Sequence, residues 1–141
     1  MTKQNDNILP FSCIILAAGK GTRMKSAMPK VMHQIAGEPL ISHVVSSLAP
    51  LAPEKTVLVI APEMDLVRQA VNKIDAKTKS VIQNEQLGTG HAVRITQPEF
   101  VKYTDKILIL YGDTPLITTD TLARLLTAAQ SCEIAVLGMR L

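Results

Sequence analysis

A glycine-rich loop near the N-terminus carries the residue types that would hold a polyphosphate. An apolar run ending in Leu16-Ala17-Ala18 opens into Gly19-Lys20-Gly21-Thr22-Arg23, and Pro29-Lys30 follows. Glycines let the backbone take positive φ and approach a ligand without an intervening Cβ. Backbone N–H groups in such a turn form an anion nest, and the side chains of Arg23 and Lys30 add positive charge. The loop is therefore a candidate polyphosphate site.

Two widespread nucleotide-binding motifs do not fit this loop. The dinucleotide fingerprint needs a third glycine where Met24 stands, and an acidic residue about twenty positions later, where the chain has His43 to Val45. The Walker pattern also fails because no Gly-Lys-Ser/Thr closes the loop. A purely structural turn is the alternative for the glycines alone. With Arg23 and Pro29-Lys30, the loop resembles the signature of nucleotidyltransferases that act on sugar 1-phosphates.

A second polar segment spans residues 83–92, where an apolar run turns into a predicted helix. The amide of Gln83 both donates and accepts, which suits the edge of a pyrimidine. Gly88 and Gly90 permit close approach, and Thr89 offers a hydroxyl to a ligand or to the helix. The alternative for this segment is a glycine turn with Thr89 as a helix N-cap.

A third segment places Asp113 directly after an apolar run, in the sequence Tyr111-Gly112-Asp113-Thr114-Pro115. A carboxylate beside a phosphate loop suits Mg²⁺, which prefers one or two carboxylates together with phosphate oxygens and water. The alternative is that Asp113 starts a turn before Pro115, a frequent role of aspartate. The glycine loop in the same fold favours the metal site.

Alternating apolar and amphipathic segments predict the scaffold for these loops. Strands are expected at Phe11–Leu16, Thr56–Ile60, Ser80–Gln83, Lys106–Tyr111 and Ile134–Leu137, and helices at Leu40–Leu48, Met64–Ile74, Gly90–Thr96 and Asp120–Ala129, the last with Asp120 as its N-cap. This order predicts an α/β fold with a Rossmann-like open, mostly parallel sheet and helices on both faces. Ligands bind at the carboxyl ends of such strands, where the three polar segments would meet.

Composition narrows the class of protein further. The 141 residues suffice for one α/β domain, and with 47% hydrophobic but only 3% aromatic residues the core must be aliphatic. A net charge of +3 without a basic run argues against nucleic-acid binding. No apolar run approaches the length of a membrane span, and the polar N-terminus lacks a signal-peptide pattern, so we expect a cytoplasmic protein.

The cysteines and histidines do not indicate a metal centre. Cys13 and Cys132 each lie in or beside an apolar run, which favours small buried core residues over a disulfide or a metal site. His33, His43 and His91 show no metal-ligand spacing. We interpret the first two as surface or packing residues, and the role of His91 stays open.

Taken together, the three segments resemble the N-terminal uridyltransferase domain of the bacterial bifunctional UDP-N-acetylglucosamine pyrophosphorylase and glucosamine-1-phosphate acetyltransferase family. Leu-Ala-Ala-Gly-Lys-Gly-Thr-Arg-Met, Pro-Lys, Gln-Leu-Gly-Thr-Gly-His-Ala and Tyr-Gly-Asp-x-Pro-Leu match in order, from about Ile14 to Leu141. The resemblance implies a nucleoside-diphospho-sugar transferase fold, with residues 1–141 as the N-terminal part of one nucleotidyltransferase domain. The family's acetyltransferase β-helix domain, through which its full-length members would form homo-oligomers, is absent from the chain.

The resemblance also implies a reaction and roles for individual residues. UTP and N-acetylglucosamine 1-phosphate would give UDP-N-acetylglucosamine and pyrophosphate, with Mg²⁺ as cofactor, for cell-wall precursor synthesis. Arg23 and Lys30 would be the catalytic cations on the triphosphate, and Asp113 would bind Mg²⁺. Gln83 would read uracil. The nucleotide-binding residues would be Leu16, Ala17, Ala18, Gly19, Gly21, Thr22, Lys30, Gln83, Gly88, Thr89, Tyr111 and Gly112.

Two alternatives stay open at this point. One is another nucleotidyltransferase of the same fold, such as a molybdopterin nucleotidyltransferase, which would prefer a purine or cytidine nucleotide. The other is a nucleotide-binding fragment without turnover, because the family's metal-binding asparagine and sugar contacts would lie beyond Leu141. The chain stops at Met139-Arg140-Leu141, straight after an apolar run, which we interpret as a truncated C-terminus that exposes apolar surface and favours self-association. A Rossmann oxidoreductase is disfavoured by the missing third glycine and acidic residue.

Overall fold

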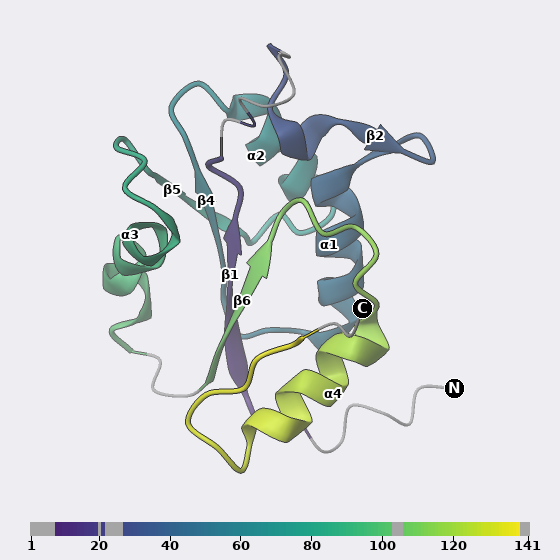
Figure 1. The fold of residues 1–141 in the computed structure, drawn as a ribbon, viewed down its shortest axis with the longest axis vertical. Coiled ribbons are helices and arrows are strands. Elements are labelled where there is room, and N and C mark those ends of the chain that lie inside the picture. Colours follow the sequence, from purple (N-terminus) through teal and green to yellow (C-terminus); the bar gives the residue numbers. More distant parts are fainter. Residues whose placement is uncertain (1–7, 20, 22–26, 103–105, 139–141) are drawn as a thin grey trace.

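A four-stranded parallel sheet forms the centre of the computed structural model, which describes residues 8–19, 21, 27–102 and 106–138. Its strands are β1 (Phe11–Leu16), β4 (Thr56–Ile60), β5 (Lys79–Ile82) and β6 (Lys106–Tyr111), arranged in the order β5-β4-β1-β6 (Figure 1). In this register Ile14 lies between Val57 of β4 and Ile109 of β6. The four strands follow the sequence prediction to within one residue at each end.

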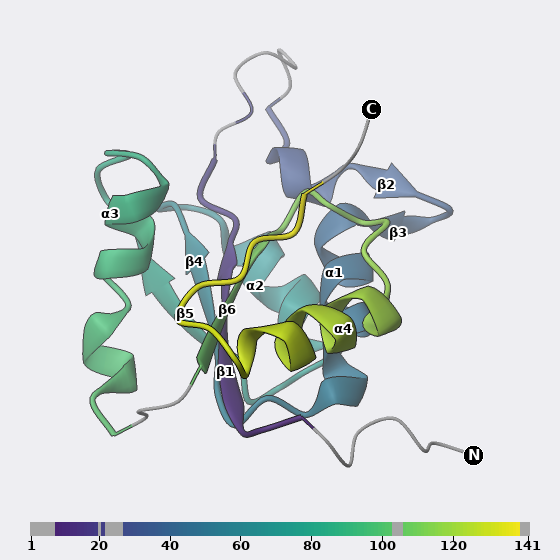
Figure 2. The same ribbon diagram turned by 60° about the horizontal axis from the view of Figure 1, so that its bottom comes forward.

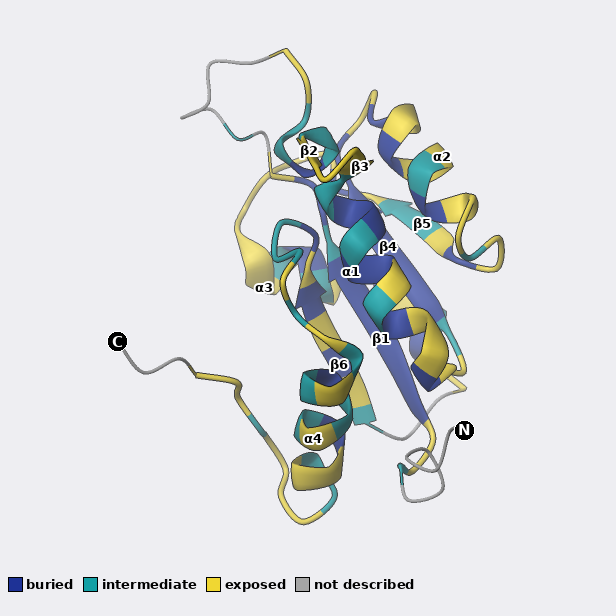
Figure 3. Cartoon of the chain, turned by 90° about the vertical axis from the view of Figure 1, so that its right-hand side faces the viewer, coloured by how far each residue is buried: buried dark blue, intermediate teal, exposed yellow. Residues whose placement is uncertain are grey.

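Helices cover both faces of the sheet, as predicted. The helices α1 (Leu40–Leu48), α2 (Asp65–Asn72) and α4 (Thr119–Ala129) lie on one face, and α3 (Thr89–Arg94) lies on the other (Figures 1 and 3). Short 3₁₀ turns η2 (Lys30–Met32), η3 (Ala49–Leu51) and η4 (Gln97–Phe100) join these elements. In the described ranges, no helix is long and apolar enough to cross a membrane.

The two inner strands supply the centre of the core. Every residue of β4 is buried, as are the first five residues of β1, because each strand has a neighbour on both edges and helices over both faces (Figure 3). Continuous runs of Val, Ile and Leu are typical of such strands. The expected aliphatic core is therefore present, and it includes Cys13, whose burial raises the pKa of its thiol well above the usual range.

The predicted fifth strand is wrong. Residues 134–137 are irregular, and the side chains of Ile134 and Val136 are 81% and 83% exposed. The segment after α4 runs back past β6 (Figure 2) without pairing with any strand in the described part of the chain. An apolar run becomes a strand only where a neighbouring backbone accepts its hydrogen bonds. Cys132, at the start of this segment, is consequently exposed rather than buried.

Two local features also differ from the sequence prediction. The N-cap of α4 is Thr118 rather than Asp120, because the Thr118 hydroxyl accepts a hydrogen bond from the Thr121 N–H while Asp120 lies in the first turn. A small antiparallel pair, β2 (Gln34–Ile35) and β3 (Glu38–Pro39), escaped prediction. Its two-residue turn has positive φ at both positions, 53° and 84°, as hairpins prefer.

Candidate nucleotide-binding site

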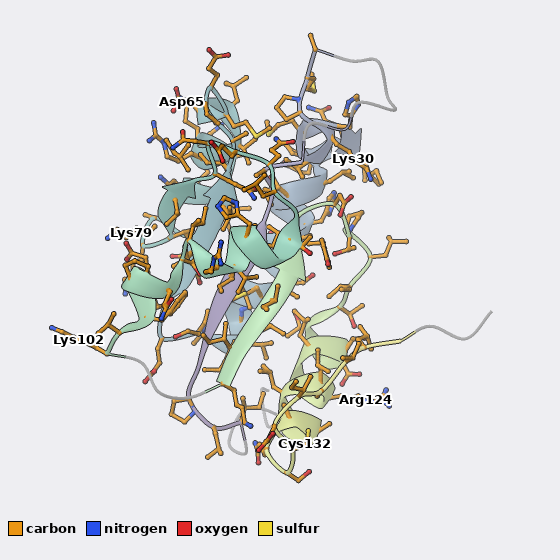
Figure 4. All side chains as sticks on the ribbon, turned by 60° about the vertical axis from the view of Figure 1, so that its left-hand side comes forward. Lys30, Asp65, Lys79, Lys102, Arg124 and Cys132 are labelled. Atoms are coloured by element: carbon orange, nitrogen blue, oxygen red, sulfur yellow. The ribbon has the colours of Figure 1, made fainter. Side chains whose placement is uncertain are left out.

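The three polar segments meet in one cleft of about 500 Å³ at the carboxyl ends of the strands. This is the edge at which open parallel sheets bind ligands. In Figure 4, Lys30 lies at this end of the molecule, whereas Lys102 and Cys132 lie toward the other end. The predicted residues that line the cleft are Leu16, Ala17, Ala18, Gly19, Gly21, Lys30, Gln83, Gly88, Thr89, Tyr111 and Asp113, joined by Val31, Gln86 and Ala92, to which the sequence analysis assigned no role.

Backbone hydrogen bonds past the strand ends hold the walls of the cleft in place. The Ala17 N–H donates to the Val59 carbonyl at 2.8 Å, and the Gly112 N–H donates to the Leu16 carbonyl at 2.9 Å. Gly21 has a φ of 57°, and a Cβ there would lie 2.9 Å from the Cβ of Lys30. Glycine is therefore required for the loop to pass so close to Lys30. Thr22 and Arg23 lie outside the described residues, so their roles stay predictions.

The two oppositely charged residues of the site contact each other. The Lys30 ammonium, on η2, donates to a carboxylate oxygen of Asp113 at 2.7 Å, with the side chains 44% and 31% exposed. The cation expected on phosphate and the carboxylate expected on Mg²⁺ thus lie at one point of the cleft, 83 residues apart in sequence. Part of each side chain stays open to solvent, so either group can exchange this partner for a ligand.

Gly112 lies outside the cleft, unlike Tyr111 and Asp113 on either side of it. It is not among the residues that line the cleft, and a Cβ there would meet Ile41 Cδ1 at 2.6 Å and Val31 Cγ1 at 3.2 Å. Its lack of a side chain lets the turn after β6 pack against α1 and η2. The structure therefore gives Gly112 a packing role, and its expected contact with the nucleotide stays a prediction.

Two glutamines organise the loop between β5 and α3. Gln83 is buried, and its Nε2 donates to the Gly88 carbonyl at 3.2 Å and lies 3.1 Å from His91 Nδ1. The Nε2 of Gln86 donates to the Ala18 carbonyl at 2.6 Å, which ties this loop to the end of β1. Sequence reasoning missed Gln86 because its partner is 68 residues away, and no local pattern connects the two.

The donor set suits a cation that arrives with its phosphate ligands. No group of three or more His, Cys, Asp or Glu residues that could hold a metal ion occurs within the described ranges. Mg²⁺ needs only one or two protein carboxylates when phosphate oxygens and water complete its octahedron. The single carboxylate of Asp113, on the wall of the cleft, fits that requirement.

Comparison with known proteins places this fold and cleft in a family. The model of the MobA-like NTP transferase domain matches residues 13–140. The chain belongs to the MobA-like NTP transferase domain family. The match includes all three segments that line the cleft, and it agrees with the interpretation of the glycine loop as part of a nucleotidyltransferase.

Within this NTP transferase family, curated relatives confirm the narrower resemblance. The chain is 46% identical over 132 residues to the bifunctional protein GlmU of Rhodospirillum rubrum, an alignment that covers 92% of this chain and 29% of that protein. It is 49% identical over 129 residues to the bifunctional protein GlmU of Pseudomonas aeruginosa (strain LESB58), covering 92% and 28%. The chain thus spans less than a third of the length of these relatives.

Solved structures confirm the fold class. UDP-glucose pyrophosphorylase complexed with UDP-glucose superposes with a TM-score of 0.67 at 21% identity, over 87% of this chain and 53% of that one. HddC from Yersinia pseudotuberculosis, complexed with GMP-PN, gives 0.67 at 27% identity over 84% and 53%. The inositol-1-phosphate CTP transferase from T. maritima gives 0.59 at 24% over 72% and 43%. The descriptions of these three proteins name a uridine, a guanosine and a cytidine nucleotide, respectively.

Proposed function

We propose that this chain is the nucleotide-binding part of a uridylyltransferase that forms UDP-N-acetylglucosamine and pyrophosphate from UTP and N-acetylglucosamine 1-phosphate. The observation that carries the proposal is the single cleft that joins the glycine loop, the Lys30–Asp113 pair and the Gln83 loop. The similarity to GlmU over 92% of the chain supports it. Residues 1–141 would then belong to one nucleotidyltransferase domain that serves cell-wall precursor synthesis in the cytoplasm.

The chemistry of this transfer asks for alignment and charge neutralisation rather than proton removal. A sugar phosphate has a second pKa of about 6, so its oxygen is already anionic at neutral pH. That oxygen would attack the α-phosphorus of UTP; a new P–O bond forms, and the bond between the α-phosphorus and the bridging oxygen breaks to release pyrophosphate. Preorganised cations and backbone N–H groups lower the barrier of such a step.

Four described side chains of the cleft have a part in this scheme. Lys30 would leave Asp113 and neutralise the triphosphate, and the backbone after β1 would lie against the nucleotide. Mg²⁺, when bound at Asp113, would neutralise further phosphate charge. Gln83 would lie at the base, and Tyr111 near the ribose. Arg23 would add a second cation.

Binding measurements with three nucleotides test the proposal. Isothermal titration of the 141-residue chain with UTP, CTP and GTP, each with Mg²⁺, should show the tightest binding for UTP. A pyrophosphate-release assay with N-acetylglucosamine 1-phosphate should show little or no turnover, because the resembled family places its sugar contacts beyond Leu141. A preference for GTP or CTP would instead support the molybdopterin-type alternative, and absence of any nucleotide binding would refute the proposal.

A further inference from the structure

His91 belongs to the Gln-Leu-Gly-Thr-Gly-His-Ala segment, yet it has no role in binding phosphate or metal in the proposed function. It is the third residue of α3 and is half-buried, with its Nδ1 3.1 Å from the Nε2 of Gln83. Gln83, at the end of β5, is only 4% exposed and lines the cleft. The ring therefore contacts the residue that would face the base.

The surrounding backbone decides which way the Gln83 carboxamide is turned. The Gly88 carbonyl can only accept hydrogen bonds, and it receives the Ala92 N–H at 3.1 Å and Gln83 Nε2 at 3.2 Å. The NH₂ group of Gln83 must therefore face Gly88. Its second N–H then faces His91 Nδ1, which acts as acceptor, so the proton of the neutral ring is on Nε2.

This arrangement uses both amide donors and leaves the amide oxygen for a ligand. Within the described part of the chain, no donor contacts Gln83 Oε1. A flipped amide would place Oε1 against the Gly88 carbonyl oxygen, and two acceptors at that distance repel each other. Gln83 accordingly offers the cleft an acceptor and no donor.

We propose that His91 is a positioning residue that sets the choice of pyrimidine, because it holds the Gln83 carboxamide with its oxygen toward the base. Uracil carries a donor, N3–H, which matches this oxygen. Cytosine carries a bare acceptor at N3, which this oxygen repels. The inference rests on the proposed function and adds to it a physical origin for base selection. The fold alone does not select the base, since its relatives are described with UDP-, GMP- and CTP-type nucleotides.

The test measures the ratio of the dissociation constants for CTP and UTP in four versions of the full chain. Wild type should favour UTP by about ten-fold or more, because a site built for a hydrogen bond rejects the analogue that cannot make it. His91→Leu removes one of two partners of the amide, so UTP affinity should fall about five-fold with little change for CTP. His91→Asn offers an amide oxygen near the place of Nδ1 and should keep the preference.

Two controls separate base selection from general damage. His43→Leu makes the same substitution on α1, where His43 Nε2 contacts the Ile35 carbonyl at 2.8 Å and lies outside the cleft lining, so the ratio should stay at the wild-type value. Pyrophosphate affinity should be equal in all four proteins because the ring of His91 hydrogen-bonds Gln83, whereas the partner of Lys30 is Asp113. Loss of pyrophosphate binding in His91→Leu would indicate a structural role and overturn the proposal.

The remaining outcomes distinguish this inference from the proposed function. A wild-type chain without a UTP preference would refute the proposed function and the inference with it. A wild-type preference that persists undiminished in His91→Leu would overturn the inference and leave the function standing. If His91→Leu does not fold, a long-range ¹H–¹⁵N spectrum of wild type decides instead: the neutral ring should carry its proton on Nε2, and a neutral ring with its proton on Nδ1 would overturn the proposal.

Discussion

At the scale of single residues, the site combines two charges that neutralise each other until a ligand arrives. Lys30 and Asp113 form a partly exposed ion pair, and such pairs contribute little to stability because solvent screens them. The pair has a different effect on binding. A phosphate can replace Asp113 as the partner of Lys30 while the cation bound to the nucleotide replaces Lys30 as the partner of Asp113, so neither charge is left unpaired. Both residues should therefore matter more for binding than for folding.

Lys30→Ala tests the cationic half of the pair. The variant should bind UTP and pyrophosphate about ten-fold more weakly or worse, because the loss leaves phosphate charge uncompensated and also frees an anionic Asp113 beside it. Isothermal titration at constant salt measures this change. The matched control is Lys77→Ala, an exposed lysine beyond α2 that does not line the cleft. Equal effects of both substitutions would remove Lys30 from the site.

Asp113→Asn tests the carboxylate. With the ammonium of Lys30 released, UTP binding without Mg²⁺ should become tighter than in wild type, whereas the gain that Mg²⁺ gives wild type should disappear. Melting temperatures should stay close to the wild-type value, because the side chain is not buried. An unfolded variant, or one that keeps its full response to Mg²⁺, would support the alternative that Asp113 only shapes the turn before Pro115.

The sequence predicted those residues of the site that follow strands, because the ends of parallel strands must meet at one edge. It did not predict how side chains from different loops contact each other. The Lys30–Asp113 and Gln86–Ala18 contacts join segments 83 and 68 residues apart, and no periodicity or motif encodes such pairs. His91 was recognised as part of a motif, yet its contact with Gln83 became visible only in the folded loop.

At the scale of elements, an ion-pair cluster attaches η4, which is separated from α3 by two residues, to the end of the sheet opposite the cleft. One carboxylate oxygen of Glu99 accepts from Lys55 Nζ at 2.8 Å and the other from Lys79 Nζ at 2.8 Å (Lys79 is labelled in Figure 4). Lys55 immediately precedes β4 and Lys79 begins β5. These two hydrogen bonds lower the pKa of the Glu99 carboxyl, the one from Lys55 having the larger effect.

This lowered pKa predicts a pH-dependent contribution to stability. Because the folded state favours the ionised carboxylate, the contribution is complete above the unfolded-chain pKa of about 4.3 and is lost as the pH falls through the lower folded pKa. Glu99→Gln should therefore melt at a lower temperature than wild type at pH 7, and the two curves should converge on the acid side. Thermal melts between pH 3 and 7 measure this difference in melting temperature.

Asp65→Asn, in the exposed Asp65–Arg68 pair, is the control, and its melting temperature should differ little from wild type. A Glu99→Gln deficit that is equal at pH 3 and pH 7 would contradict the assignment.

The positions of most strands could be predicted from the sequence, but whether an apolar run finds a strand to pair with could not. Apolar runs predicted β1, β4, β5 and β6, and each of these runs pairs with at least one neighbouring strand of the sheet. The equally apolar residues 134–137 form no strand, since strand formation depends on a hydrogen-bonding neighbour as well as on composition. Likewise, Asp120 and Thr118 are both plausible caps, and only the local backbone shows that Thr118 has the extended conformation a cap requires.

At the scale of the whole molecule, apolar surface gathers at one edge of the sheet. β6 is one of the two edge strands, and Ile107 and Ile109 on it are 43% and 44% exposed. Residues of β6, α4 and the segment 133–137 line an apolar groove. Unpaired strand edges and apolar patches of this kind promote association between copies of a chain.

We therefore expect the 141-residue chain to self-associate through this edge. Sedimentation velocity at increasing protein concentration should show a weight-average mass that rises above that of the monomer. Replacing both Ile107 and Ile109 by Lys should suppress the rise, because charged side chains on an edge strand oppose pairing with a second copy. Leu66→Lys is the matched control, since Leu66 is 61% exposed on α2, away from the groove. Its association should equal that of wild type. A wild-type chain that stays monomeric at all concentrations, or a double variant that associates as strongly as wild type, would show that this surface does not drive contact between copies.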